Sequence, residues 1–133
     1  MNFSIEHIGL AAQNTAALKD WYVSVLGAKV LFADGKTPPA FFLELPGGPL
    51  IEIYGSARSI PETANNALGG WRHLALRVNS LEAARDELTR RGVSFTEPVK
   101  PAGGGGRILF FRDAEGNLLH LTERPAESVF HSR

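Results

Sequence analysis

The chain contains no cysteine, which excludes disulfide bonds, thiolate metal ligands and a cysteine nucleophile. It also has no net charge, because 14 basic residues balance 14 acidic ones. A nucleic-acid-binding domain usually carries a basic patch, so this class is disfavoured. No apolar run approaches the roughly 20 residues that cross a bilayer, and the first residues lack the pattern of a signal peptide. We therefore expect a soluble cytoplasmic protein with no nucleic-acid or membrane partner.

The 133 residues that are present have an ordinary globular composition, with 44% hydrophobic and 21% charged residues. This length suits a single compact domain with a usable core. The four histidines and the acidic residues are then the main source of chemistry, because no thiol is available.

Two segments have the spacing of an amphipathic helix. Apolar residues recur at i, i+3, i+4, i+7 and i+8 across 18–26, and a similar stripe runs through 81–88. Asn14 or Thr15 can cap the first helix, and Asn79 can cap the second. We predict one helix in each half of the chain.

Strand-like segments surround both helices in the same order. One predicted strand precedes each helix and three follow it. The predicted strands are 5–12, 29–33, 40–45 and 50–54 in the first half, and 71–78, 93–95, 108–112 and 118–123 in the second half.

Four residues with metal-binding side chains fall at equivalent points of these halves. His73 follows His7 by 66 residues, and His120 follows Glu52 by 68 residues. A nearly constant shift indicates a duplicated β-α-β-β-β unit. A lone histidine on a strand is more often a satisfied polar group than a ligand, so the prediction rests on the set.

Strand alternation places these four residues on comparable faces. In each of their strands one face is aliphatic and the other carries a single imidazole or carboxylate. Glu52 lies within the apolar run Leu50–Tyr54, where an unpaired carboxylate is expensive to bury. A metal ion or an arginine would compensate this charge. Imidazole and carboxylate ligands suit Zn, Ni, Co, Fe or Mn, so we predict one divalent ion held by His7, Glu52, His73 and His120.

Several short motifs occur in order over about residues 3–124. They are His7–Leu10, Trp21-Tyr22 with Leu26-Gly27, Leu50–Tyr54, Arg72–Val78 and Arg112–Leu121. Together they resemble the vicinal oxygen chelate superfamily, which includes glyoxalase I, methylmalonyl-CoA epimerase, extradiol dioxygenases, and fosfomycin- and bleomycin-resistance proteins.

The resemblance implies an α+β fold in which two paired βαβββ modules form a cupped, mostly antiparallel sheet with helices on the outer face. Module 1 would cover about 3–54 and module 2 about 71–124, joined by a linker at 55–70 within a single domain. A tail at 125–133 would be partly disordered. Homodimerisation is also implied by the resemblance.

The function implied by the resemblance is that of a glyoxalase I-like lyase or isomerase. A small substrate with adjacent oxygens would bind the metal, which stabilises an enolate, while His120 or Glu52 moves the proton. The family typically has glutamate where this chain has His120, which leaves this residue as ligand or base and favours an anionic substrate. The expected pocket residues are Phe42, Glu44, Tyr54, Trp71 and Arg107.

Two other functions remain open. An Fe(II) extradiol-type dioxygenase would use two histidines and Glu52 as a 2-His-1-carboxylate triad. A metal-free drug-binding protein, similar to the bleomycin-resistance relatives, would not need the ligand set. The glycine-rich run 101–106 lacks the P-loop ending, and we interpret it as a mobile loop that would suit a lid.

Overall fold

The computed structural model describes residues 1–132. They divide between Pro61 and Glu62 into two compact units, here called module 1 and module 2, and each is described by itself. The division falls within the segment expected to be the linker. No helix among the described residues is both long enough and apolar enough to cross a membrane.

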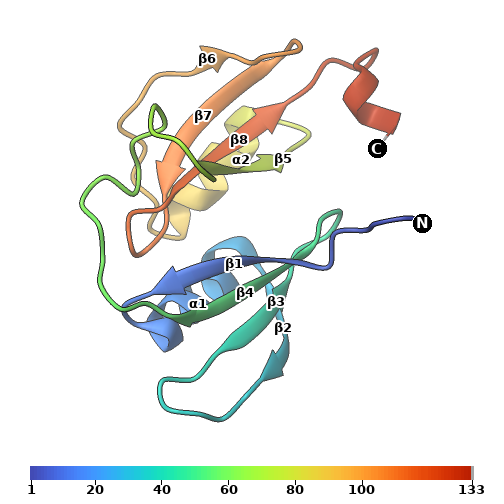
Figure 1. Ribbon diagram of the computed structural model, residues 1–133. Helices are drawn as coiled ribbons and strands as arrows, with labels where there is room; N and C mark the ends of the chain where they lie inside the picture. Colours follow the sequence, from blue (N-terminus) through green and yellow to red (C-terminus); the bar gives the residue numbers. More distant parts are fainter. Residues whose placement is uncertain (133) are drawn as a thin grey trace. The chain divides into compact units, whose positions relative to one another are not determined.

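Module 1 is a four-stranded sheet with one helix (Figure 1). The strand order is β1-β4-β3-β2, with β1 and β4 parallel and the other neighbours antiparallel. Its elements are β1 (His7–Ala12), α1 (Thr15–Leu26), β2 (Lys29–Ala33), β3 (Phe41–Glu44) and β4 (Leu50–Gly55).

Module 2 repeats this layout with the strand order β5-β8-β7-β6 and a parallel pair between β5 and β8. The predicted α+β fold with two mostly antiparallel βαβββ modules is therefore confirmed. Its elements are β5 (His73–Arg77), α2 (Leu81–Arg90), β6 (Lys100–Pro101), β7 (Arg107–Arg112), β8 (Leu118–Glu123) and the 3₁₀ helix η1 (Val129–Ser132).

The helix of module 1 begins and ends at residues suited to those positions. Asn14 is the N-cap, and its side chain accepts a hydrogen bond from the backbone N–H of Ala17 at 3.0 Å. Gly27 ends the helix in the left-handed region, with φ of 71°. The apolar face of α1 is buried together with Leu43, Ile51 and Ile53 on one face of the sheet. The opposite face is left for polar side chains.

Module 2 corrects two sequence predictions. Ser80, not Asn79, caps α2 by accepting from the backbone N–H of Ala83. The predicted strand at 93–95 does not form; Val93 is buried there, and the ring centroids of Phe95 and Phe111 lie 5.6 Å apart. The strand that pairs with β7 is instead β6, seven residues further on at its start.

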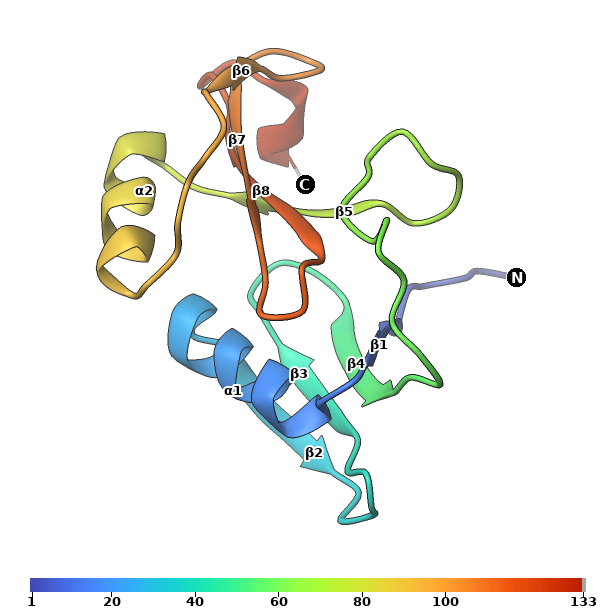
Figure 2. The ribbon, with the colours of Figure 1, turned by 90° about the vertical axis from the view of Figure 1, so that its left-hand side faces the viewer.

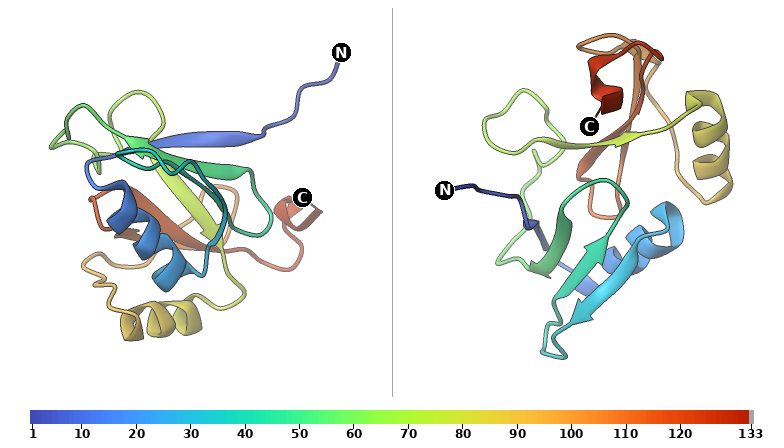
Figure 3. Two further views of the ribbon diagram at one scale, coloured as in Figure 1. Left: turned by 90° about the horizontal axis from the view of Figure 1, so that it is seen from below. Right: turned by 90° about the vertical axis from the view of Figure 1, so that its right-hand side faces the viewer.

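The tail is also more ordered than expected. Residues 129–132 form η1, and α2 and η1 lie on opposite sides of the β7–β8 ribbon (Figures 2 and 3). The Phe130 ring of this segment lies against Gly104 in the loop 102–106. Residue 133 lies outside the described part of the chain.

Truncating the core face of α1 should destabilise the fold. Leu18 has 0% exposure, so Leu18→Ala should lower the free energy of unfolding by about 2–5 kcal/mol through lost burial and a residual cavity. Val23 on the same helix is 39% exposed, and Val23→Ala should change the free energy of unfolding by no more than roughly 0.5 kcal/mol. Denaturant titration of both variants measures the difference, and equal losses would contradict the described packing.

Candidate metal centre

In module 1, His7 and Glu52 face each other across the parallel pair of strands. His7 Nε2 lies 3.5 Å from Glu52 Oε1. Gly9 is the residue directly opposite Glu52 in the register, so no β1 side chain separates the two groups. On the other side of Glu52 is Phe42, whose ring meets the His7 ring edge-on at 5.2 Å. Module 1 thus brings together an imidazole, a carboxylate and an aromatic wall.

Module 2 repeats this arrangement with His73 and His120. Their ring centroids are 4.8 Å apart, and His120 is only 6% exposed. The small residue Ala75 is opposite His120 on β5, and Phe110 is opposite it on β7. The Phe110 ring lies 5.0 Å from His120. The sequence analysis missed Phe110, although strand alternation through residues 107–112 could have identified it.

Each of the three imidazoles has its Nδ1 atom against an oxygen. His7 Nδ1 lies 2.8 Å from Glu6 Oε1, and His73 Nδ1 lies 2.8 Å from Asn66 Oδ1. Carboxylate and amide oxygens only accept hydrogen bonds, so Nδ1 carries the proton in both rings. The lone pair is then on Nε2, the atom that can bind a metal.

The His120 ring is oriented in the same way, with Nδ1 facing oxygen atoms. Its Nδ1 is 2.8 Å from the hydroxyl oxygen of Thr122 and 3.3 Å from the carbonyl oxygen of Leu121. Burial lowers the pKa of His120, and the nearby charge of Arg124 lowers it further, whereas the hydrogen bond to the carbonyl of Leu121 raises it. His120 is therefore held neutral, with Nε2 as its basic atom.

The contact between His7 and Glu52 bears on whether a metal cation would fit between these two side chains. A separation of 3.5 Å is longer than an ordinary N–H···O hydrogen bond. With the proton on Nδ1, the Nε2 lone pair faces a carboxylate oxygen, which is unfavourable without a cation or a second proton nearby. The donor set thus fits a divalent ion with nitrogen and oxygen ligands.

The four predicted ligands form two pairs, one in each module. Among residues 1–132, no group of three or more histidine, aspartate or glutamate side chains is gathered closely enough to hold a metal. The four-residue ligand set therefore stays a prediction. The sequence could not indicate the partners Glu6 and Asn66, which come from the segments preceding the strands.

The predicted pocket residues differ in their placement. Phe42 borders the His7–Glu52 pair, and Tyr54 shares the face of Glu52, packing where a side chain at Gly9 would be. Glu44 is exposed at the end of β3. Trp71 is 96% exposed just before β5. The pocket role of these residues stays a prediction.

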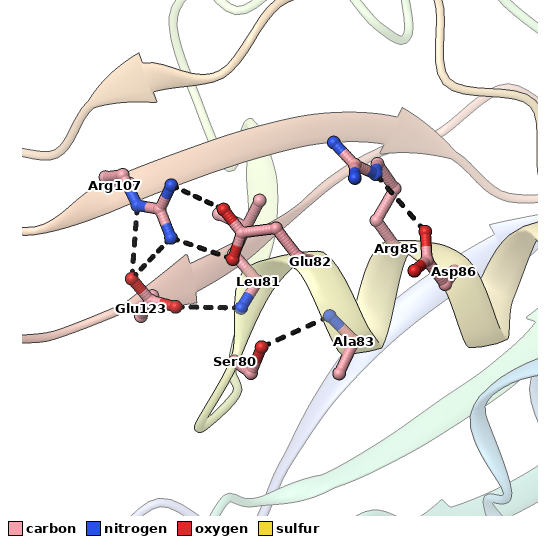
Figure 4. A network of polar contacts seen from close by, with 8 residues as sticks. All are labelled: Ser80, Leu81, Glu82, Ala83, Arg85, Asp86, Arg107 and Glu123. Atoms are coloured by element: carbon pink, nitrogen blue, oxygen red, sulfur yellow. Dashed lines mark hydrogen bonds and ion pairs between the residues drawn. The ribbon is translucent and has the colours of Figure 1, made fainter.

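Arg107 lies away from the imidazoles, on the face of the sheet covered by α2 (Figure 4). Its guanidinium donates to both carboxylate oxygens of Glu82 at 2.7 and 3.0 Å and to Glu123 Oε1 at 2.8 Å. Glu123 Oε2 accepts in turn from the backbone N–H of Leu81, the first residue of α2. Arg107 therefore anchors the start of this helix, and this geometry does not support its expected pocket role.

This chain belongs to the Glyoxalase/Bleomycin resistance protein/Dioxygenase superfamily, whose family model matches residues 4–121. The uncharacterized protein YwkD of Bacillus subtilis is 30% identical over 125 residues, which cover 91% of this chain and 97% of YwkD. The crystal structure of a glyoxalase family protein from Enterococcus faecalis is 30% identical, with a TM-score of 0.75 over 90% of this chain and 97% of that one.

A more distant structure has the same fold. A fosfomycin resistance protein from Listeria monocytogenes, complexed with Mn(II) and dihydroxypropylphosphonic acid, is 21% identical with a TM-score of 0.71. It covers 96% of this chain, and this chain covers 94% of it. The family resemblance and the fold are therefore shown, while the activity is not fixed by these relatives.

The Arg107 network should make module 2 acid-sensitive. The hydrogen bonds from Arg107 lower the pKa of Glu82 from 4.5 to about 2. The network's contribution to stability is thus complete above the ordinary pKa and is lost as the pH falls towards 2. The melting temperature should fall less between pH 5 and 2 in Glu82→Gln than in the unmodified protein. Glu62→Gln, a change outside the network, should keep the original pH dependence; an identical profile for all three proteins would refute the assignment.

Proposed function

We propose that the chain is a divalent-metal-dependent lyase or isomerase of the vicinal oxygen chelate superfamily, acting on a small substrate with oxygens on adjacent atoms. The ion would be Zn, Ni, Co, Fe or Mn. The proposed ligands are His7, Glu52 and His73, with His120 as the fourth ligand or the base.

The polarity of the three imidazoles is the observation that carries this proposal. In all three rings Nδ1 faces an oxygen, so each ring presents Nε2. Histidine ligands of metals characteristically donate their other ring N–H to a carboxylate, carbonyl or similar acceptor. A shared metal site requires this orientation of all three rings. Glu52 and His120 each have a small residue opposite them on one neighbouring strand and a phenylalanine on the other. This repeated arrangement also supports a metal site.

A divalent ion at this site supplies Lewis acidity towards paired substrate oxygens. The remaining work falls to the residues of the chain. Glu52 contributes the negative charge of the ligand set, and Phe42 and Phe110 exclude water beside the ligands. His120, buried and neutral, can accept a substrate proton at Nε2 if that atom is not a ligand.

Elemental analysis of untagged protein tests the metal site first. We expect about one divalent ion per chain, lost in His7→Ala and in His73→Ala. The matched control is His131→Ala, because this fourth histidine lies in η1 and belongs to neither pair. If none of the five metals binds more tightly than millimolar, the enzyme proposal fails and a metal-free drug-binding function is favoured.

The hydroxyl of Thr122 offers a finer test, since it touches Nδ1 of His120 and no proposed ligand set includes it. Thr122→Val keeps the shape of the side chain and removes that contact. If His120 is a ligand, metal affinity should fall by roughly 10- to 100-fold. If His120 is the base, metal content should stay unchanged while turnover falls. A variant unchanged in both measurements would remove His120 from the site.

Two further measurements separate the alternatives in reaction class and assembly. Oxygen consumption with catechols under Fe(II) would favour the dioxygenase over the lyase or isomerase.

We also propose a homodimer, so light scattering should give about twice the 14.4 kDa mass of one chain. A mass of one chain at all concentrations would contradict the dimer without affecting the metal result.

A further inference from the structure

Two arginines stand on the same face of module 2 as its imidazoles. Arg77 follows His73 by four residues on β5, and Arg124 follows His120 by four at the end of β8. Residues separated by an even number share a strand face, and four residues span about 13 Å. Each strand thus carries an imidazole and, further along, a guanidinium. Glu123, the acidic residue beside Arg124, turns to the opposite face and binds Arg107.

The hydrogen-bond partners of both guanidiniums are neutral carbonyl oxygens. Arg77 Nη2 donates to the carbonyl of Phe130 at 2.5 Å. Arg124 Nη1 donates to the carbonyls of Gly103 and Gly105 at 2.5 and 2.7 Å. Among residues 1–132, neither guanidinium has a carboxylate within ion-pair distance. Their positive charges are therefore not neutralised by the described part of the chain.

The C-terminal segment holds this pair of arginines in place. The Phe130 ring stacks on the guanidinium of Arg124, with 3.9 Å between the guanidinium carbon and the ring centroid. The same ring lies against Gly104, where an added Cβ would be 2.6 Å from Phe130 Cε2. The tail and the loop 102–106 are thus joined through Arg124. A third cation on this face, Lys100, lies over the Phe110 ring and is also 3.6 Å from Glu97, so its charge is partly balanced.

We propose that Arg77 and Arg124 form a subsite for the anionic oxygens of a substrate, a carboxylate or phosphate group, and that the loop and tail carbonyls occupy these guanidiniums until the anion displaces them. This inference rests on the proposed function, in which the metal binds the adjacent oxygens at the other end of the substrate. It narrows the substrate class to an elongated molecule with adjacent oxygens at one end and an anionic group at the other. Guanidinium prefers an anionic acceptor to a neutral carbonyl, because a carboxylate or phosphate adds Coulomb attraction and can accept two parallel N–H bonds from one guanidinium.

Nuclear magnetic resonance titration of the metal-free protein with inorganic phosphate tests the subsite directly. Saturable shifts should appear at the amides of 103–105 and 126–131. Arg124→Gln and Arg77→Gln should each weaken binding by about tenfold, the loss expected for one charge-assisted contact. Arg85→Gln is the matched control, since Arg85 lies on α2 beside Asp86 and should bind phosphate normally. A parallel titration with acetate shows whether carboxylates or phosphates are preferred.

Phe130→Ala separates an anion subsite from a purely structural latch. Removing the ring should loosen the tail and reduce its competition, so phosphate should bind more tightly. Arg124→Lys, which keeps the charge but loses the planar fork, should bind with intermediate affinity and checks that the glutamine variant has not simply unfolded. No saturable shift, or equal affinity in the arginine variants and the unmodified protein, would overturn the proposal. Metal content measured separately on Arg124→Gln should be unchanged, so a failed subsite and a failed metal site give different results.

Discussion

The parallel pairing of the first and last strands in each module is the constraint on which the rest of the structure depends. Parallel neighbours need a crossover connection, and here a helix lies between β1 and β2 and between β5 and β6. The aliphatic face of the sheet is buried with that helix, as Ile51, Ile53, Leu119 and Leu121 show. The second face of each sheet is not covered by that helix. On this second face, side chains from the two parallel strands lie next to each other, and the candidate ligands are among them.

Most of this organisation could be predicted from the sequence, because it depends on periodicity within one segment. Alternation in residues 50–54 and 118–123 places Glu52 and His120 on their faces without any tertiary information. The predictions that failed depended on partners far along the chain. Residues 93–95 form no strand although Phe95 lies against Phe111, and Arg107, whose pocket role stays a prediction, binds Glu82 on the helix side. Capping of α2 shifted by one residue, because Asn79 and Ser80 are both good caps and only the backbone geometry separates them.

The two half-sites are equivalent in geometry and different in charge. Each has an edge-strand histidine, a small residue opposite the central ligand and a phenylalanine on the next strand. The proposed ligand on the inner strand is Glu52 in module 1 and His120 in module 2. A divalent ion held by one carboxylate and three imidazoles would keep a net positive charge. Arg77, Arg124 and Lys100 lie in module 2, where the carboxylate is missing.

The glycine-rich run makes close contacts that its composition alone did not indicate. Four consecutive glycines at 103–106 suggested a mobile loop. In the structure, a Cβ at Gly106 would lie 2.0 Å from the carbonyl oxygen of Glu123, and a Cβ at Gly104 would meet the Phe130 ring. These glycines permit close approach to β8 and to the tail, in positive-φ conformations that other residues rarely adopt. The same absence of side chains exposes the carbonyls of Gly103 and Gly105 to Arg124. The glycine-rich segment 103–106, which its sequence suggests to be flexible, thus binds the C-terminal residues of module 2.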